Sequence, residues 1–204
     1  MQGILLLNDL HPSSKNMTAN MSDICKKMKT EGFDFCSLAT CHALQHMVDP
    51  KLSNQPKLEG SVKPGQCTWF SPIQPMWSGD DEEYSKDVWG TAWSEWLREE
   101  DYEVEEYSRK DLLFAKFTKG RLANGADQRF KKAGEFRDER GYFHVPRWGK
   151  VASQYGGIHV DLSTNNDVFP GWDIETVCVW DPTVFTEIQW FPNSGKPWEY
   201  EVLY

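Results

Sequence analysis

A succession of strand-like segments near the end of the chain limits the folds open to it. Residues 174–180 (IETVCVW) are rich in β-branched side chains, which favour a strand, and Asp181-Pro182 predicts a turn directly after them. Residues 185–191 predict a further strand, and residues 158–162 predict one before the pair. Because the first half of the chain mixes strands with helices, this order predicts an α+β fold with a mostly antiparallel sheet, not a doubly wound parallel one.

The other elements follow from hydrophobic spacing and from the positions of glycine and proline. Strands are predicted at residues 4–7, 33–40, 66–70 and 112–117, and helices at residues 17–29, 84–100, 127–132 and 148–155. The strand at 66–70 is expected to end at Ser71-Pro72, and the helix at 84–100 rests on the helical spacing of Val88, Ala92 and Trp96.

The length of 204 residues fits one domain. We expect residues 1–204 to form that single domain, with 1–32 as an N-terminal strand–helix appendage and 33–204 as the core. Ten Trp are present beside 11 Phe and 7 Tyr. Aromatic side chains this dense can build a core, and they can also line a pocket for a flat ligand.

The net charge of −9 bears on possible partners. An acidic domain repels phosphate backbones, so binding to nucleic acid is disfavoured. Arg129, Lys131, Lys132 and Arg137 form a local basic cluster, which a solvated helix face explains equally well. No stretch approaches the roughly 20 apolar residues of a membrane span, so no membrane partner is expected.

Five cysteines without a CxxC pair indicate reduced thiols and therefore a cytoplasmic protein. The compartment would be the host cytoplasm if the chain is a viral or secreted effector. The N-terminal segment has a short apolar run and no basic region before it, which does not fit a signal peptide.

Cysteine and histidine gather in the pattern Cys36-x4-Cys41-His42-x3-His46. The spacing matches no standard zinc finger, and the two His are not part of an HEXXH motif, so we expect no metal. Cys41 and His42 are adjacent on a predicted strand and point to opposite faces, which argues against a cysteine–histidine catalytic pair. Cys178 lies within an apolar strand and is expected to be an inert core thiol.

Three motifs far apart in the sequence could together form a site. His42 lies at the end of SLATCH, the residues Trp69, Phe70 and Ser71 follow one another in CTWFSP, and Glu175 lies near the start of the strand at 174–180. In this order the chain resembles the ADP-ribosyltransferase superfamily, similar to its polyvalent-protein, phage and toxin domains. That family has a first strand ending in His or Arg, a second strand with an aromatic residue followed by Ser, Thr or Tyr, and a late Glu-x-Val-Val-Phe-Asp-Pro strand.

The last of these motifs reads ETVCVWDP at residues 175–182, and YGGI at 155–158 stands for the family's Tyr-Asp-Gly-Ile. Ala43-Leu44 follows His42 where the family has Gly-Thr. The resemblance covers roughly residues 33–190 and implies a split, mostly antiparallel two-sheet core with flanking helices.

The resemblance implies that NAD is the substrate and that no metal is needed. Cleavage of the nicotinamide–ribose bond develops positive charge on the sugar, which a carboxylate can stabilise. The resemblance assigns the catalytic roles to Glu175, His42 and Ser71. It also implies that NAD binds against His42, Trp69, Phe70 and Ser71. Asp173 would help to bind NAD and to steer transfer to a macromolecular acceptor, which we expect to be a protein.

Two other functions remain open. An NAD glycohydrolase would use the same residues with water as the acceptor. A non-enzymatic interaction or inhibitor protein would instead block a partner through aromatic surface residues, such as those in PMWSGDDEE (75–83) and KPWEYEVLY (196–204). The ordered motifs favour an enzyme, an ADP-ribosyltransferase, over both.

Overall fold

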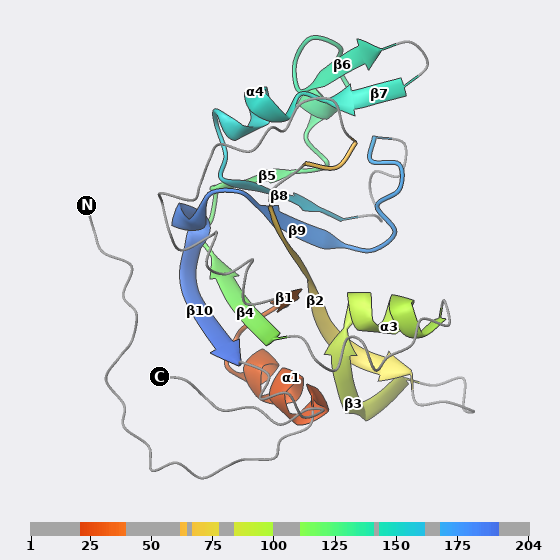
Figure 1. Cartoon of the computed structure of the whole chain (residues 1–204), viewed down its shortest axis with the longest axis vertical. Helices are drawn as coiled ribbons and strands as arrows, with labels where there is room; N and C mark the ends of the chain where they lie inside the picture. The colour runs from red at the N-terminus through yellow and green to blue at the C-terminus, as the bar shows by residue number, and fades with distance from the viewer. Residues whose placement is uncertain are drawn as a thin grey trace.

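The computed structural model describes residues 21–39, 62–64, 67–77, 84–99, 111–140, 143–161 and 168–191 (Figure 1). Its helices are α1 (Met21–Thr30), α3 (Ala92–Glu99) and α4 (Trp148–Ala152). Its strands are β1 (Phe35–Ala39), β2 (Thr68–Trp77), β3 (Tyr84–Thr91), β4 (Asp111–Phe117), β5 (Leu122–Asn124), β6 (Arg137–Arg140), β7 (Phe143–Pro146), β8 (Gly157–Val160), β9 (Thr176–Val179) and β10 (Phe185–Phe191).

Eight of the strands in the described ranges join into one sheet in the order β10-β4-β1-β2-β9-β8-β5, with β3 paired to β2 off this path. The pairs are antiparallel except for β5 and β8, which run parallel. Strands β6 and β7 form a separate hairpin. The fold is therefore α+β with a mostly antiparallel sheet, as predicted. Where we expected two sheets packed face to face, the β1–β2 pair instead joins both halves into one sheet.

The sheet curls so that its two halves face each other. Leu113 of β4 and Val177 of β9 belong to the same buried cluster as Phe70 of β2, although β1 and β2 separate β4 from β9 in the sheet. Side chains two strands apart or more meet in this way only when the sheet bends toward them. We call the face that carries Phe70, Leu113 and Val177 the inner face.

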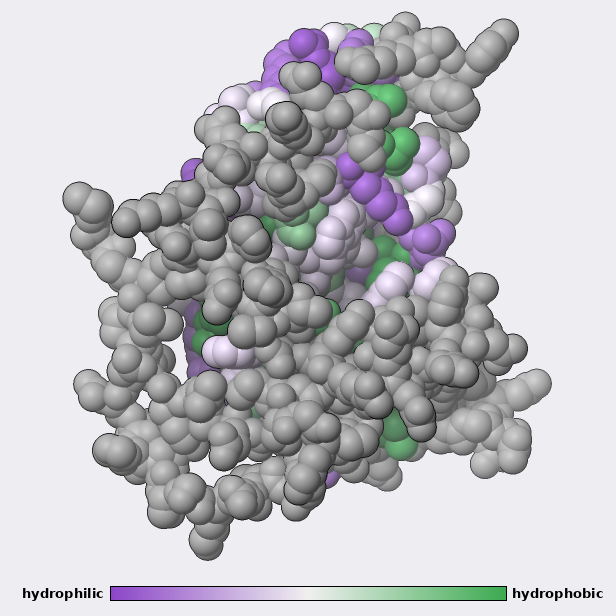
Figure 2. Space-filling model, viewed as in Figure 1, coloured by the Kyte–Doolittle hydropathy of each residue, from purple (hydrophilic) through white to green (hydrophobic). Residues whose placement is uncertain are grey.

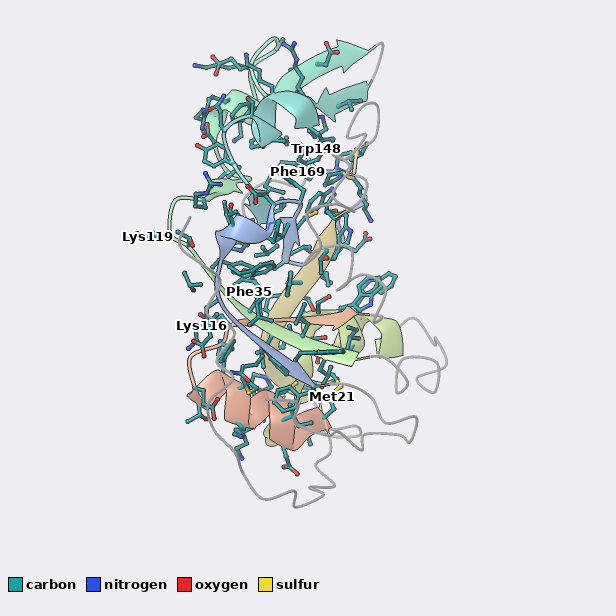
Figure 3. The ribbon with its side chains drawn as sticks, turned by 60° about the vertical axis from the view of Figure 1, so that its left-hand side comes forward. Met21, Phe35, Lys116, Lys119, Trp148 and Phe169 are labelled. Atoms are coloured by element: carbon teal, nitrogen blue, oxygen red, sulfur yellow. The ribbon has the colours of Figure 1, made fainter. Side chains whose placement is uncertain are left out.

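The outer face carries the alternate side chains and is covered by two other clusters. The first gathers around Trp148, Phe169 and Cys178, and the second packs Phe114 of β4 beneath α1. In Figure 3, Trp148 and Phe169 lie together toward one end of the molecule, whereas Met21 of α1 lies at the other. Each half of the sheet thus has its own cover on the outer side.

Helix α1 confirms the predicted helix over its described part. Ile24, Cys25 and Met28 are buried at the expected spacing, and Gly32 follows with φ of 83°, a conformation that glycine adopts readily. The helices in the described ranges are short, and none is long and apolar enough to cross a membrane.

The strand predicted at 66–70 is longer than expected, because β2 continues through Ser71-Pro72 to Trp77. Proline lacks the N–H that a strand donates, so it usually ends a central strand. In β2 the pairing with β9 stops at Phe70, while Pro72 pairs with β1 and Pro75 pairs with β3. Each proline therefore lies where β2 has a recorded neighbour on one side only.

The helix predicted at 84–100 is wrong in its first half. Residues 84–91 form β3 against β2, and only Ala92–Glu99 are helical. The spacing of Val88, Ala92 and Trp96 suggested one helix, but Val88 belongs to β3 whereas Ala92 and Trp96 belong to α3. Thr91 marks the boundary: its Oγ1 accepts from the N–H of Ser94 at 3.0 Å, a cap that starts α3.

The later elements agree more closely with prediction. Strands β4, β8, β9 and β10 lie within or next to the predicted strands, and α4 begins at Trp148 as predicted. The helix expected at 127–132 is a short 3₁₀ helix, Gln128–Phe130, capped by Asp127. The strand expected at 4–7 and the start of the helix expected at 17–29 lie outside the described residues.

Phe114 should contribute strongly to stability. It is fully buried, with ring centroids 5.5 Å from Phe191 and 6.4 Å from Phe33. We expect Phe114→Ala to lower the free energy of unfolding by about 3–5 kcal/mol because it leaves a cavity in the core. Urea unfolding followed by circular dichroism measures this loss. The control is Ile188→Ala on β10, where the side chain is 36% exposed and the expected loss is below about 1 kcal/mol. Equal losses in both variants would contradict the described core.

Candidate functional site

A cavity of about 390 Å³ opens on the outer face between the two covering clusters. Strands β1 and β2, the segment before β9, and helix α3 all contribute to its walls. The residues that line it include Trp69, Ser71, Trp93, Trp172, Asp173 and Thr176. A cavity of this size is at the lower end of the range of small-molecule sites.

Aromatic rings form much of the cavity wall. The ring centroids of Trp69 on β2 and Trp172 lie 5.0 Å apart. Trp172 is held from behind by Trp148, stacked at 6.3 Å, and by Phe169 at 5.4 Å. Trp93 of α3 also lines the cavity. Because these rings are packed into the fold, they offer preformed flat surfaces to a ligand.

Buried hydroxyl groups lie beside the rings. Ser71 and Thr176 face the same side, since β2 and β9 are antiparallel neighbours and both residues line the cavity. The Oγ of Ser71 accepts from the N–H of Trp93 at 3.4 Å, which leaves its own proton for another acceptor. The hydroxyl of Thr176 donates to the carbonyl of Ile174 at 2.9 Å, which leaves its oxygen able to accept.

Helix α3 is fixed over β2 by polar contacts. The side-chain amide of Gln74 donates to the carboxylate of Glu95, which is buried. The N–H of Trp93 donates to Ser71, as described above, and the ring of Trp93 stacks on that of Trp96 with centroids 4.9 Å apart. These contacts hold Trp93 against the cavity.

Polar groups of Trp172, Asp173 and Lys63 belong to residues of the cavity wall. The indole Nε1 of Trp172 is buried and has no hydrogen-bond acceptor among the residues that the structure describes. Buried donors of this kind are rare in proteins, and because this one is inaccessible to solvent it does not open onto the cavity. Asp173 follows directly, with its side chain exposed at the cavity, and Lys63 lies on the lining as well.

The structure brings together four of the residues that the sequence analysis assigned to a site. Trp69, Phe70, Ser71 and Asp173 all line the cavity. The ring of Phe70, however, packs into the inner cluster, with its centroid 5.4 Å from that of Phe117. His42 lies outside the described residues, although β1, which precedes it, reaches the cavity through Cys36 and Leu38.

The structure does not bring Glu175 together with Ser71. Glu175 Oε1 lies 2.7 Å from Nε2 of His159 on β8, and the His159 ring lies 5.5 Å from that of Phe35. His159 is in register with Val177, whose side chain belongs to the inner cluster. The carboxylate of Glu175 is therefore on the inner face, whereas Thr176 faces the cavity on the outer face.

Sequence reasoning did not assign several residues that line the cavity or lie behind it. Thr176 could have been found from strand alternation, since it must face opposite to Val177. His159 could have been paired with Glu175 only if β8 and β9 had been aligned in register. Trp172 and Trp93 gave no local signal, because their position depends on contacts between distant segments.

Cys36 and Cys67 both line the cavity, and Cys36 is not a candidate nucleophile. Cys36 lines the cavity, but burial raises the pKa of its thiol well above the usual value. Burial likewise raises the pKa of Cys25 to about 12, and it raises that of Cys178. A thiol attacks as the thiolate, so these groups are unreactive near neutral pH. Cys25, Cys36, Cys67 and Cys178 are the cysteines within the described ranges, and each is a free thiol.

No cluster of three or more potential metal ligands occurs in the described part of the chain, and Cys41, His42 and His46 lie outside it. The cavity instead combines flat rings, hydroxyl groups and one carboxylate, which together can hold a planar ring attached to a polyhydroxylated sugar.

Comparison with models of known protein families finds no match, and neither curated proteins nor solved structures provide one.

Proposed function

We propose that the protein is an NAD-dependent ADP-ribosyltransferase and that the outer-face cavity binds the nicotinamide-ribose part of NAD. The observation that carries this proposal is the grouping of Trp69, Ser71 and Asp173, from two motifs about a hundred residues apart, on one cavity. These residues belong to the motifs that resemble the ADP-ribosyltransferase superfamily.

The shape and chemistry of the cavity suit this substrate. Nicotinamide is a flat, cationic ring in NAD, and the rings of Trp69 and Trp172 offer it aromatic faces. Its amide oxygen would accept a hydrogen bond from the Ser71 hydroxyl. A volume of about 390 Å³ fits a single nucleoside better than a whole dinucleotide, so the adenosine half would extend outside.

The reaction breaks the bond between the ribose C1′ and the ring nitrogen of nicotinamide. The bonding electron pair moves to that nitrogen and neutralises the ring, while positive charge develops on the sugar. A carboxylate beside the sugar stabilises this charge. The acceptor then forms the new bond to C1′ and loses a proton, and nicotinamide leaves.

The segment before β9 offers two carboxylates for this role. The resemblance implies Glu175, but in the structure Glu175 is bonded to His159 on the inner face. Asp173 is the acidic side chain on the cavity lining. We therefore propose that Asp173 is the carboxylate that faces the sugar and that Glu175 fixes His159 behind the sheet.

The two carboxylates can be separated by matched variants. We expect Asp173→Asn to lower the rate of nicotinamide release from NAD at least ~100-fold, because the amide cannot neutralise a developing cation. Glu175→Gln should lower it less than about 10-fold, because the side chain retains a hydrogen bond to His159. Both rates are measured beside the melting temperature of each variant.

The reverse order of effects would assign the catalytic carboxylate to Glu175. It would also require the segment before β9 to present its other side to the ligand. If the wild-type protein releases no nicotinamide from NAD, the enzymatic proposal fails and the interaction-protein alternative gains support.

Trp69 should contribute to substrate binding through its ring. We expect Trp69→Ala to raise the KM for NAD about 10-fold or more, in line with the roughly 1–3 kcal/mol that stacking of a base on an aromatic side chain provides. Trp96→Ala is the control, since Trp96 stacks on Trp93 but is not part of the cavity lining. Similar changes in both variants would argue against a specific role for Trp69.

Transfer and hydrolysis differ in the fate of the ADP-ribose. With NAD labelled in the adenine ring and a cell lysate as the source of acceptors, we expect label on a macromolecule. Asp173→Asn should remove this label. Release of free ADP-ribose alone, in the presence of the lysate, would instead identify an NAD glycohydrolase.

A further inference from the structure

The charges of this acidic protein are unevenly distributed along the chain. Residues 119–150 contain nine of the 22 Lys and Arg but only four of the 31 Asp and Glu. This part therefore carries a net charge of +5, and the rest of the chain carries −14. It includes β5, β6, β7 and the start of α4, which occupy one end of the molecule, and hydrophilic side chains gather there (Figures 1 and 2).

Some of these cations are already neutralised. Arg121 Nη2 lies 3.1 Å from Asp181, and Arg129 Nη2 lies 2.6 Å from Asp127. Five others are exposed and form no ion pair with a carboxylate in the described ranges: Lys119, Lys131, Lys132, Arg147 and Lys150. We call the last four of these, which lie around the turn at Gly134, the basic face.

Two residues of the basic face meet at one backbone turn. Arg147 Nη1 and Lys150 Nζ both donate to the carbonyl oxygen of Gly134, at 2.9 and 3.1 Å. The two charges are therefore within about 6 Å of each other, where they repel, and an anion between them would relieve the repulsion. Lys131 and Lys132 precede Gly134 by only two or three residues.

The turn itself is fixed by backbone contacts. Gly134 has φ of 80°, and its N–H donates to the carbonyl of Arg137 at 2.9 Å. The N–H of Arg147 donates to the carbonyl of Phe136 at 2.8 Å, which joins α4 to the turn. The cations thus project from a backbone that is already set, so the backbone loses little freedom when a ligand binds.

We propose that the basic face binds the phosphate backbone of a nucleic acid. Arg and Lys are the usual phosphate ligands, and a pair of cations on one turn suits the regularly spaced charges of a strand. The overall charge of −9 argued against such binding only as an average over the chain. With the charges separated, the acidic remainder repels the polyanion and confines its contact to this end.

This surface is connected to the cavity. Trp148, at the start of α4, stacks on Trp172, which forms part of the cavity wall. A nucleic acid on the basic face would therefore lie beside α4, whose first residue contacts the cavity residue Trp172. The proposal concerns binding alone and does not depend on NAD cleavage.

The test measures binding of a fluorescein-labelled single-stranded oligonucleotide, as DNA and as RNA, by fluorescence anisotropy. We expect a Kd of about 10⁻⁴–10⁻⁶ M that weakens between about 50 and 200 mM salt. Lys131→Gln/Lys132→Gln should weaken binding and reduce the slope of log K against log salt by about 1.5. Arg147→Gln/Lys150→Gln should do the same.

The matched control is Lys27→Gln/Lys29→Gln on α1, which changes the net charge by the same amount. These lysines lie close to Glu31 and Asp34, outside the basic face, and the control should bind like the wild type. Absence of binding at about 50 mM salt, or equal loss in the control, would overturn the proposal. Displacement of the oligonucleotide by poly-glutamate as readily as by unlabelled DNA would also overturn it, in favour of an acidic protein partner.

Discussion

The packing between β4 and β9 across the inner face is the interaction on which the rest of the structure depends. Leu113 and Val177 share one buried cluster with Phe70, although two strands separate them in the sheet. Burial of this apolar surface favours the curled sheet. Curling has a second effect, because it spreads the outer side chains of the same strands apart. The outer face is then covered by two clusters instead of one, and the cavity lies between them.

The start of β9 decides which chemistry the cavity can perform. Along a strand, side chains alternate between faces, so Thr176 and Val177 point in opposite directions. Glu175 directly precedes the strand, and its side chain lies on the inner face, where it contacts His159. Asp173 lies three residues before the first residue of β9, where the alternation of side chains between the two faces no longer applies. Its side chain can therefore line the cavity on the outer face. A shift of one residue in the β8–β9 register would exchange these positions.

Sequence patterns predicted the elements whose signals are local. Residues 185–191 formed the strand β10 as predicted, and β4 needed only one more residue than predicted. The errors arose where pairing between strands decides the secondary structure. The prolines of β2 are tolerated because β2 pairs there with a strand on one side only. Residues 84–91 form a strand because β2 pairs with them. Within the site, Trp69 and Ser71 were recognisable from one motif. The positions of Trp172 and His159 depend on contacts with distant segments, which no local pattern encodes.

The stack of Trp148 and Trp172 links the basic end of the molecule to the cavity. Trp148 is buried beside Phe169 and contacts Trp180 after β9, so the ring behind the cavity wall is part of a core. Trp172 packs against that core through Trp148, and its ring also lies beside that of Trp69. A wall built in this way is rigid before any ligand arrives, which lowers the entropy lost on binding. The unsatisfied Nε1 of Trp172 is a cost of this wall, because the packing that holds the ring leaves the donor buried without an acceptor among the described residues.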